Sequence, residues 1–227
     1  MNHSTDNALK ALLTVLLLTA PIAPALPAEE VPAAEPAEPV NAFWNDYELD
    51  FTFSGFKTFY SCTGLRDKVK YVLKELGARE DLKVRAMGCE PGGGPSRFPR
   101  VKVNVALPMA ATAENLAELE KDADKRELVA RVRGERYVDP SEEAAQFPAT
   151  LETVRLSSRD SRRLEEGDCE LMEQISRRLL PELGFAVTDS NLGCVPGQVR
   201  LAEVMIEVQA LKKVTPPDEL PAPAPAR

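Results

Sequence analysis

The stretch Cys62-Thr63-Gly64-Leu65 opens a pattern that this sequence contains twice. The first copy ends at Gly88-Cys89-Glu90-Pro91-Gly92, and the second runs from Cys169-Glu170-Leu171-Met172 to Gly193-Cys194-Val195-Pro196-Gly197. In each copy fourteen residues separate the first cysteine from the glycine of a Leu-Gly pair, and the Gly-Cys-x-Pro-Gly ending is the same. Self-similarity of this kind indicates a duplicated structural unit.

Aromatic residues gather just before the first copy of the pattern. Eight of the thirteen aromatics of the chain lie in residues 43–60, so we expect this stretch to supply much of the core. Polar and apolar residues alternate over residues 48–53, as in a strand, and the alternation resumes one residue out of phase over residues 56–60. The change of phase falls at Ser54-Gly55, where glycine permits a bulge or a tight turn.

In each copy the sequence pattern predicts a helix and two strands after the opening strand. In the first, apolar residues repeat with helical spacing up to Gly77, and strands are expected at residues 82–87 and 101–107. In the second, we expect an opening strand near residues 151–156, a helix that Pro181 kinks or closes early, and strands at 185–188 and 204–208. The apolar helix positions are Leu65, Val69, Val72, Leu73 and Leu76 in the first copy, and Leu171 or Met172, Ile175, Leu179 and Leu183 in the second.

These elements predict an α+β fold of two tandem β-α-β-β repeats, at residues 43–108 and 148–213, with the helices packed on an antiparallel or mixed sheet. The two sheets are expected to merge or to pack closely together. Residues 109–147 form a charged connector that we expect to be partly helical between Glu114 and Gly134.

The two ends of the chain have a different composition. Residues 1–28 resemble a signal peptide: Lys10 precedes an apolar run of about ten residues, which is too short to span a bilayer. Residues 29–42 form a Pro/Ala/Glu-rich linker and residues 214–227 a Pro/Ala-rich tail, and both are expected to be disordered. The sequence thus predicts a soluble periplasmic or secreted protein without a membrane span.

Four cysteines in an exported chain indicate two disulfides. Of the three possible pairings, the repeat selects Cys62–Cys89 with Cys169–Cys194, because duplicated units are expected to keep duplicated bonds. The paired ligand spacing of zinc sites and the C-x-x-C of redox motifs are both absent, so no metal site is predicted.

Histidine-based catalysis is excluded, because the only histidine is His3 in the predicted signal peptide. The run Gly92-Gly93-Gly94 lacks a following Gly-Lys-Ser/Thr, and we interpret it as a turn. A carboxylate pair remains possible, although Asp67 and Asp168 could equally complement helix N-termini. The sequence therefore predicts no catalytic residue and no cofactor, with a carboxylate-based, glycan-active hydrolase of the cell envelope as the alternative.

The charge is unevenly distributed between the two copies. The whole chain has a net charge of −8, which argues against nucleic-acid binding, yet residues 62–102 hold ten Lys/Arg and five Asp/Glu. Arg66, Lys70 and Lys74 form a basic stripe at i, i+4, i+8 on the predicted first helix. This basic stripe could bind an anionic ligand or an envelope protein, or it could be an ordinary solvated helix face.

The residues around both first cysteines resemble a family of uncharacterised exported proteins of proteobacteria. The resemblance is carried by residues 59–69, Leu76-Gly77-Ala78-Arg79 and Gly88-Cys89, and in the second copy by residues 167–171. It implies export and a two-part layout, and no activity. The sequence as a whole predicts a non-catalytic binding or structural module.

Overall fold

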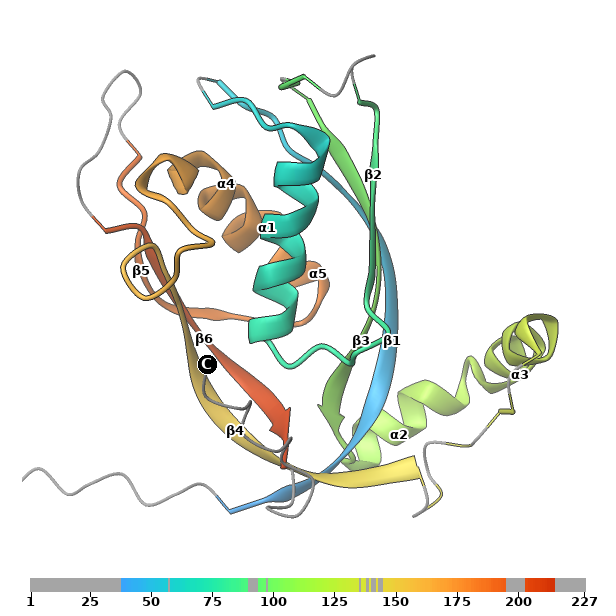
Figure 1. Cartoon of the computed structure of the whole chain (residues 1–227). Helices are drawn as coiled ribbons and strands as arrows, with labels where there is room; N and C mark the ends of the chain where they lie inside the picture. Colours follow the sequence, from blue (N-terminus) through green and yellow to red (C-terminus); the bar gives the residue numbers. More distant parts are fainter. Residues whose placement is uncertain are drawn as a thin grey trace, which may run out of the picture. The chain divides into compact units, whose positions relative to one another are not determined.

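One six-stranded antiparallel sheet carries the fold in the structure, a computed structural model (Figure 1). It describes residues 38–214 apart from 57, 90–93, 97, 135, 138, 140–141, 143–144 and 195–202. The predicted signal peptide, most of the predicted linker, nearly all of the tail and the Gly92-Gly93 part of the expected turn lie outside the described residues.

The strand order is β2-β3-β1-β4-β6-β5. The first three strands come from the first half of the chain: β1 is Val40–Thr52, β2 is Lys83–Met87 and β3 is Arg100–Ala110. The other three come from the second half: β4 is Gln146–Ser157, β5 is Val187–Asn191 and β6 is Met205–Lys213. The halves meet where residues 40–43 of β1 pair with residues 146–149 of β4, so that, of the two expected arrangements, the structure has the merged sheet.

Two strands start earlier than the sequence predicted. β1 begins at Val40, inside the predicted linker, and β4 begins at Gln146, inside the predicted connector. Both extensions pair with each other, and Ala42 and Ala149 are buried there. These segments are stabilised as strands by non-local pairing, which local patterns do not encode.

Helix α1, Cys62–Glu75, lies in the concave side of the curved sheet together with the helical segment of the second half (Figure 1). Ser61 caps α1, since its Oγ accepts a hydrogen bond from the Gly64 N–H at 3.0 Å. Gly77 follows with φ 87°, a left-handed conformation that glycine adopts without strain. Every apolar position predicted for this helix is buried.

The helix of the second half is not closed early by Pro181. It runs as α4, Cys169–Gln174, through a π turn at Ile175–Leu179 into α5, Leu180–Glu182. In the π turn the Leu180 N–H bonds to the Ile175 carbonyl, which widens the helix just before the proline. The wider turn lets the chain pass a residue that lacks an N–H.

The expected helical connector is confirmed as two short helices, α2 (Ala113–Glu120) and α3 (Ala123–Arg133). They project from the sheet as an arm in Figure 1, and neither helix buries a side chain. Arg126 links the arm to β1 by donating to Asn45 Oδ1 at 2.8 Å. Within the part of the chain that the structure describes, no helix has the length and apolar content needed to cross a membrane.

The structure contains both disulfides with the predicted pairing. The Cα atoms are 5.8 Å apart in Cys62–Cys89 and 5.7 Å apart in Cys169–Cys194. Each bond ties the start of a helix to the chain just after the following strand, and none of the four cysteines is free. Because each bond closes a loop of similar length, each is expected to stabilise the fold by about 3.5 kcal/mol in a chain-entropy estimate.

Candidate functional site

A buried carboxylate joins the two halves of the molecule. Asp168 ends a 3₁₀ turn, Glu166–Asp168, just before α4, and is only 2% exposed. Its Oδ1 accepts from the Tyr60 hydroxyl at 2.5 Å, and its Oδ2 accepts from Lys68 Nζ at 2.6 Å and from the Glu165 N–H at 2.7 Å. We call Tyr60, Lys68 and Asp168 the buried cluster.

The buried cluster is electrostatically balanced, because Lys68 pairs with the buried carboxylate. Burial, together with the neighbouring Asp168 carboxylate, raises the pKa of Tyr60 well above its ordinary value. Lys68 also donates to the Arg163 carbonyl at 3.2 Å and lies 3.5 Å from Glu165. Donors surround the carboxylate on both oxygens, as expected of a structural tie between α1 and the second half.

Next to the buried cluster, a row of polar side chains on the second helix binds the backbone that connects β1 to α1. Arg178 donates to the Thr52 carbonyl at 3.0 Å. The amide group of Gln174 binds both the N–H and the carbonyl of Ser54, at 2.9 and 3.0 Å. We call Glu170, Gln174 and Arg178 the polar row.

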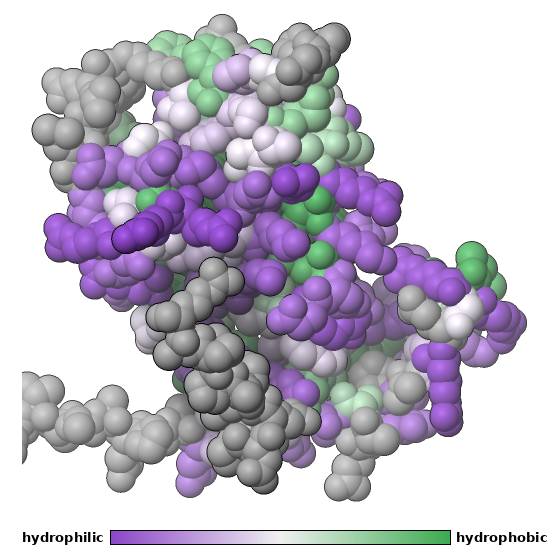
Figure 2. All heavy atoms as spheres, in the orientation of Figure 1, coloured by the Kyte–Doolittle hydropathy of each residue, from purple (hydrophilic) through white to green (hydrophobic). Residues whose placement is uncertain are grey.

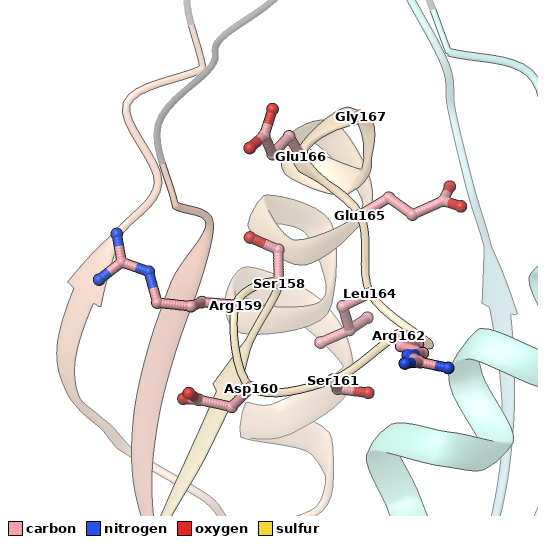
Figure 3. Close-up of a pocket in the computed structure, with 9 residues that line it drawn as sticks. All are labelled: Ser158, Arg159, Asp160, Ser161, Arg162, Leu164, Glu165, Glu166 and Gly167. Carbon is pink, nitrogen blue, oxygen red and sulfur yellow. The ribbon is translucent and has the colours of Figure 1, made fainter.

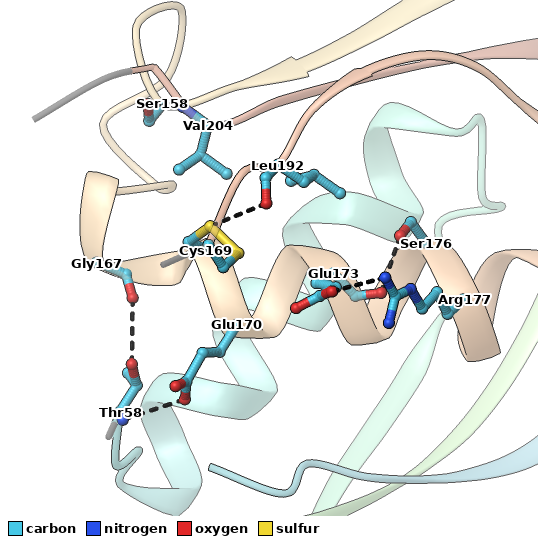
Figure 4. The surroundings of a disulfide bond; sticks show 11 residues. Thr58, Ser158, Gly167, Cys169, Glu170, Glu173, Ser176, Arg177, Leu192 and Val204 are labelled. Atoms are coloured by element: carbon cyan, nitrogen blue, oxygen red, sulfur yellow. Dashed lines mark hydrogen bonds and ion pairs between the residues drawn. A yellow bond between two sulfur atoms is a disulfide. The ribbon is translucent and has the colours of Figure 1, made fainter. Parts of the chain in front are cut away.

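Glu170 completes the polar row at the end of the connection nearest the second disulfide (Figure 4). Its Oε2 accepts from the N–H groups of Phe56, at 3.1 Å, and Thr58, at 3.3 Å. The Thr58 hydroxyl also lies 3.4 Å from the Gly167 carbonyl, to which it donates. The backbone of residues 52–58 is therefore bound along the helix at every second residue.

The outer side of the same connection exposes phenylalanine. Phe56 is 68% exposed and Phe59 is 51% exposed, and Phe98, just before β3, is 57% exposed. The two segments are neighbours, because Phe53 N–H donates to the Pro99 carbonyl and Ser96 N–H donates to the Tyr60 carbonyl. We call Phe56, Phe59 and Phe98 the aromatic patch. Figure 2 shows apolar surface at the end of the molecule where this connection lies in Figure 1.

Residues 43–60 supply part of the core, as predicted, but not every aromatic residue of this stretch is buried. Residues 43–60 do supply core side chains, such as Phe43, Phe51 and Phe53, but Phe56 and Phe59 are not among them. At Gly55 an added Cβ would lie 1.9 Å from the Thr58 carbonyl oxygen. Only glycine fits at this close approach of the backbone, and the side chains of Phe56 and Phe59 that follow it lie outside the core.

A second candidate is a hollow formed by residues 158–162 and 164–167, beside the buried cluster (Figure 3). Its carboxylates belong to Asp160, Glu165 and Glu166, and Figure 3 shows them pointing in different directions. Asp160 lies 3.4 Å from Arg155, and Glu165 faces Lys68. These three groups do not converge on one point where a bond could be cleaved by an acid and a base.

The basic stripe lies on the outer side of α1. Arg66 pairs with Asp67 at 2.9 Å, whereas Lys70 and Lys74 are exposed and have no ion-pair partner among the described residues. Of the two aspartates predicted to complement helix N-termini, Asp67 lies beyond the first turn of α1. Asp168 does stand at the N-cap position of α4 and completes a capping box with Glu165 in the preceding 3₁₀ turn, although its side chain makes no capping bond to α4 itself. An anion-binding role for the basic stripe stays a prediction.

Within the described residues, no group of three or more acidic, cysteine or histidine side chains is placed to hold a metal ion. Comparisons of the chain with protein-family models, with curated proteins and with solved structures found no match.

The sequence contained signals for the aromatic patch that the alternation pattern obscured. Gly55 and the change of phase pointed to a turn, and a turn residue such as Phe56 is a poor candidate for the core. Phe98 stands between Arg97 and Pro99, outside any predicted strand. The buried cluster had no comparable signal, because Tyr60 and Asp168 are 108 residues apart.

Proposed function

We propose that this protein is a non-catalytic binding module of the cell envelope, and that the aromatic patch is its docking surface. The observation that carries the proposal is that three phenylalanines, each more than half exposed, stand on segments held by hydrogen bonds. Exposed apolar groups on a fixed backbone are typical of interaction sites, because a partner can bury them without first ordering the chain.

The proposal includes duplication followed by divergence. Its support is that each half has the same strand arrangement, β2-β3-β1 and β5-β6-β4, and the same position for its disulfide. The segment before Cys62 contains Phe56, Phe59 and Tyr60, whereas residues 158–168 contain no aromatic residue. The binding role is therefore placed in the first half, and the second half serves as its support.

Export is the second part of the proposal. Two disulfides favour an oxidising compartment, in keeping with the predicted signal peptide. The periplasm, or the medium after secretion, is the expected location.

A glycan hydrolase is the weaker alternative, because its chemistry needs two carboxylates that flank one bond. The acidic groups of the hollow diverge, and Asp168 is enclosed by its donors. This arrangement supports binding over hydrolysis.

Site-specific photocrosslinking in intact cells tests the proposal. Phe59 is replaced by a photoreactive phenylalanine derivative, and Leu151 of β4, which is also 51% exposed, is replaced in a matched control. We expect a covalent adduct, with protein or lipid, at position 59 and none at position 151. Adducts at neither position, or equal adducts at both, would contradict a docking surface at the aromatic patch.

A further inference from the structure

We propose that the occupant of the aromatic patch is the surface of a lipid bilayer with anionic headgroups. This inference rests on the proposed function and names the class of its partner. The membrane contact would consist of Phe56 and Phe59 from the β1–α1 connection and Phe98 from the segment before β3.

The shape of the aromatic patch favours a bilayer. Its side chains stand on two connecting segments at one end of the sheet, and the hollow of Figure 3 is lined by residues 158–162 and 164–167, none of which is a phenylalanine. Aromatic side chains on loop tips can enter the boundary between headgroups and acyl chains, where no complementary pocket is needed.

The charge around the aromatic patch favours anionic lipid. Arg100, two residues after Phe98, is exposed and lies in register with Met87 on one side and Thr52 on the other. In the sequence Lys57 follows Phe56 and Arg97 precedes Phe98, although both lie outside the described residues. Basic residues beside apolar anchors are attracted to anionic headgroups.

The charge of residues 62–102 is opposite in sign to that of the whole chain. A net charge of −8 repels the molecule from an anionic surface, whereas residues 62–102, with ten Lys/Arg and five Asp/Glu, are attracted to it. Such an asymmetry favours an approach in which residues 62–102, which include Phe98, face the lipid.

The polar row holds the backbone that carries Phe56. Glu170 holds the backbone on both sides of residue 57, and Gln174 holds Ser54. Phe56 therefore enters the bilayer from a backbone that is already ordered, and little conformational entropy is lost on binding. Glu170 is a positioning residue in this scheme.

Vesicle co-sedimentation tests the inference with the chain as cells produce it. The probes are vesicles of phosphatidylglycerol mixed with phosphatidylcholine, and vesicles of phosphatidylcholine alone. We expect binding to the anionic vesicles only, and a decrease when sodium chloride is raised to about 0.5 M, because salt screens the attraction. The variant F56S/F59S/F98S is expected to bind at least about tenfold more weakly.

The matched control is L128S/V132S, which removes exposed apolar side chains from α3 and leaves the aromatic patch and the N-terminus intact. It is expected to bind like the unaltered protein. Circular dichroism checks that each variant is folded, and the single variants F56S and F98S replace the triple variant if it is not. Absence of binding to anionic vesicles, equal binding to both vesicle types, or full binding by the patch variants would overturn the inference.

The two tests separate the two proposals. A protein adduct at position 59 without vesicle binding would overturn the lipid partner and leave the docking surface standing. Absence of both adduct and vesicle binding would remove the proposed function as well.

Discussion

The connection between β1 and α1 has two sides that differ in almost every property. On the inner side Tyr60 is buried and bonded to Asp168, and the backbone of residues 52–58 is bound by the polar row. On the outer side Phe56 and Phe59, on the same short segment, are mostly exposed.

The comparison shows that the exposed phenylalanines stand on a backbone that is held in place. An exposed phenylalanine on a poorly held loop could fold back onto the protein, whereas the hydrogen bonds to Glu170 and Gln174 oppose such a movement. Stability and binding are thus expected to depend on different residues of one segment, and this separation can be tested by substitution.

The largest loss of stability is expected for a substitution of Asp168. Asp168→Ala leaves Lys68 and the Tyr60 hydroxyl without their buried acceptor, and we expect the free energy of unfolding to fall by about 3–5 kcal/mol. Urea denaturation followed by circular dichroism measures it. The control is Asp67→Ala, which removes an exposed partner of Arg66 and is expected to cost at most about 0.5 kcal/mol. Equal losses in the two variants would contradict a special role for the inner side.

The next largest loss of stability is expected when either disulfide is removed. The variant C62S/C89S is expected to lose about 3.5 kcal/mol, and C169S/C194S a similar amount, because the loops are of similar length. Unfolding in urea, compared with the unaltered protein with and without a reducing agent, measures both. A loss below about 1 kcal/mol in either variant would show that this bond contributes little.

Tyr60→Phe has an intermediate effect and a pH signature. Loss of the hydroxyl takes one donor from Asp168 and is expected to cost about 1–3 kcal/mol at neutral pH. Because the pKa of Tyr60 is raised in the folded state, its stabilisation is complete below the ordinary pKa of about 10 and is lost as pH rises above it.

Thermal unfolding, measured between neutral and strongly alkaline pH, tests this pH dependence of stability. The unaltered protein is expected to lose stability more steeply than Tyr60→Phe above the ordinary tyrosine pKa. Parallel curves would show that ionisation of Tyr60 is not linked to folding.

The smallest effect on stability is expected on the outer side. F56S/F59S/F98S changes exposed side chains, and we expect a change of at most about 0.5 kcal/mol for each site. The same variant is expected to bind anionic vesicles more weakly, which the vesicle experiment measures. A large loss of stability would show that the aromatic patch belongs to the core after all.

The elements of the fold could be predicted from sequence because their signals are local. The apolar spacing from Leu65 to Leu76 indicates α1, and the repeated Gly-Cys-x-Pro-Gly ending selects the disulfide pairing. The ends of β1 and β4 were missed, since Ala42 and Ala149 are buried by a pairing between distant segments. The buried cluster and the polar row were missed for the same reason.

The aromatic patch shows a different limit of sequence patterns. Alternation over residues 56–60 is typical of a strand with one buried face, but Gly55 turns the chain, and only Tyr60 of the aromatics there is buried. Which of two neighbouring aromatics, Phe59 or Tyr60, lies inside depends on Asp168, a residue of the other half.

Amide hydrogen exchange at Phe56 and Thr58 tests most directly whether the exposed phenylalanines stand on a fixed backbone. Both N–H groups donate to Glu170, so we predict exchange as slow as that of edge-strand amides in β2, and faster exchange in Glu170→Ala. Exchange in the unaltered protein at the rate of an unstructured peptide would contradict the account, because the aromatic patch would then have no fixed support.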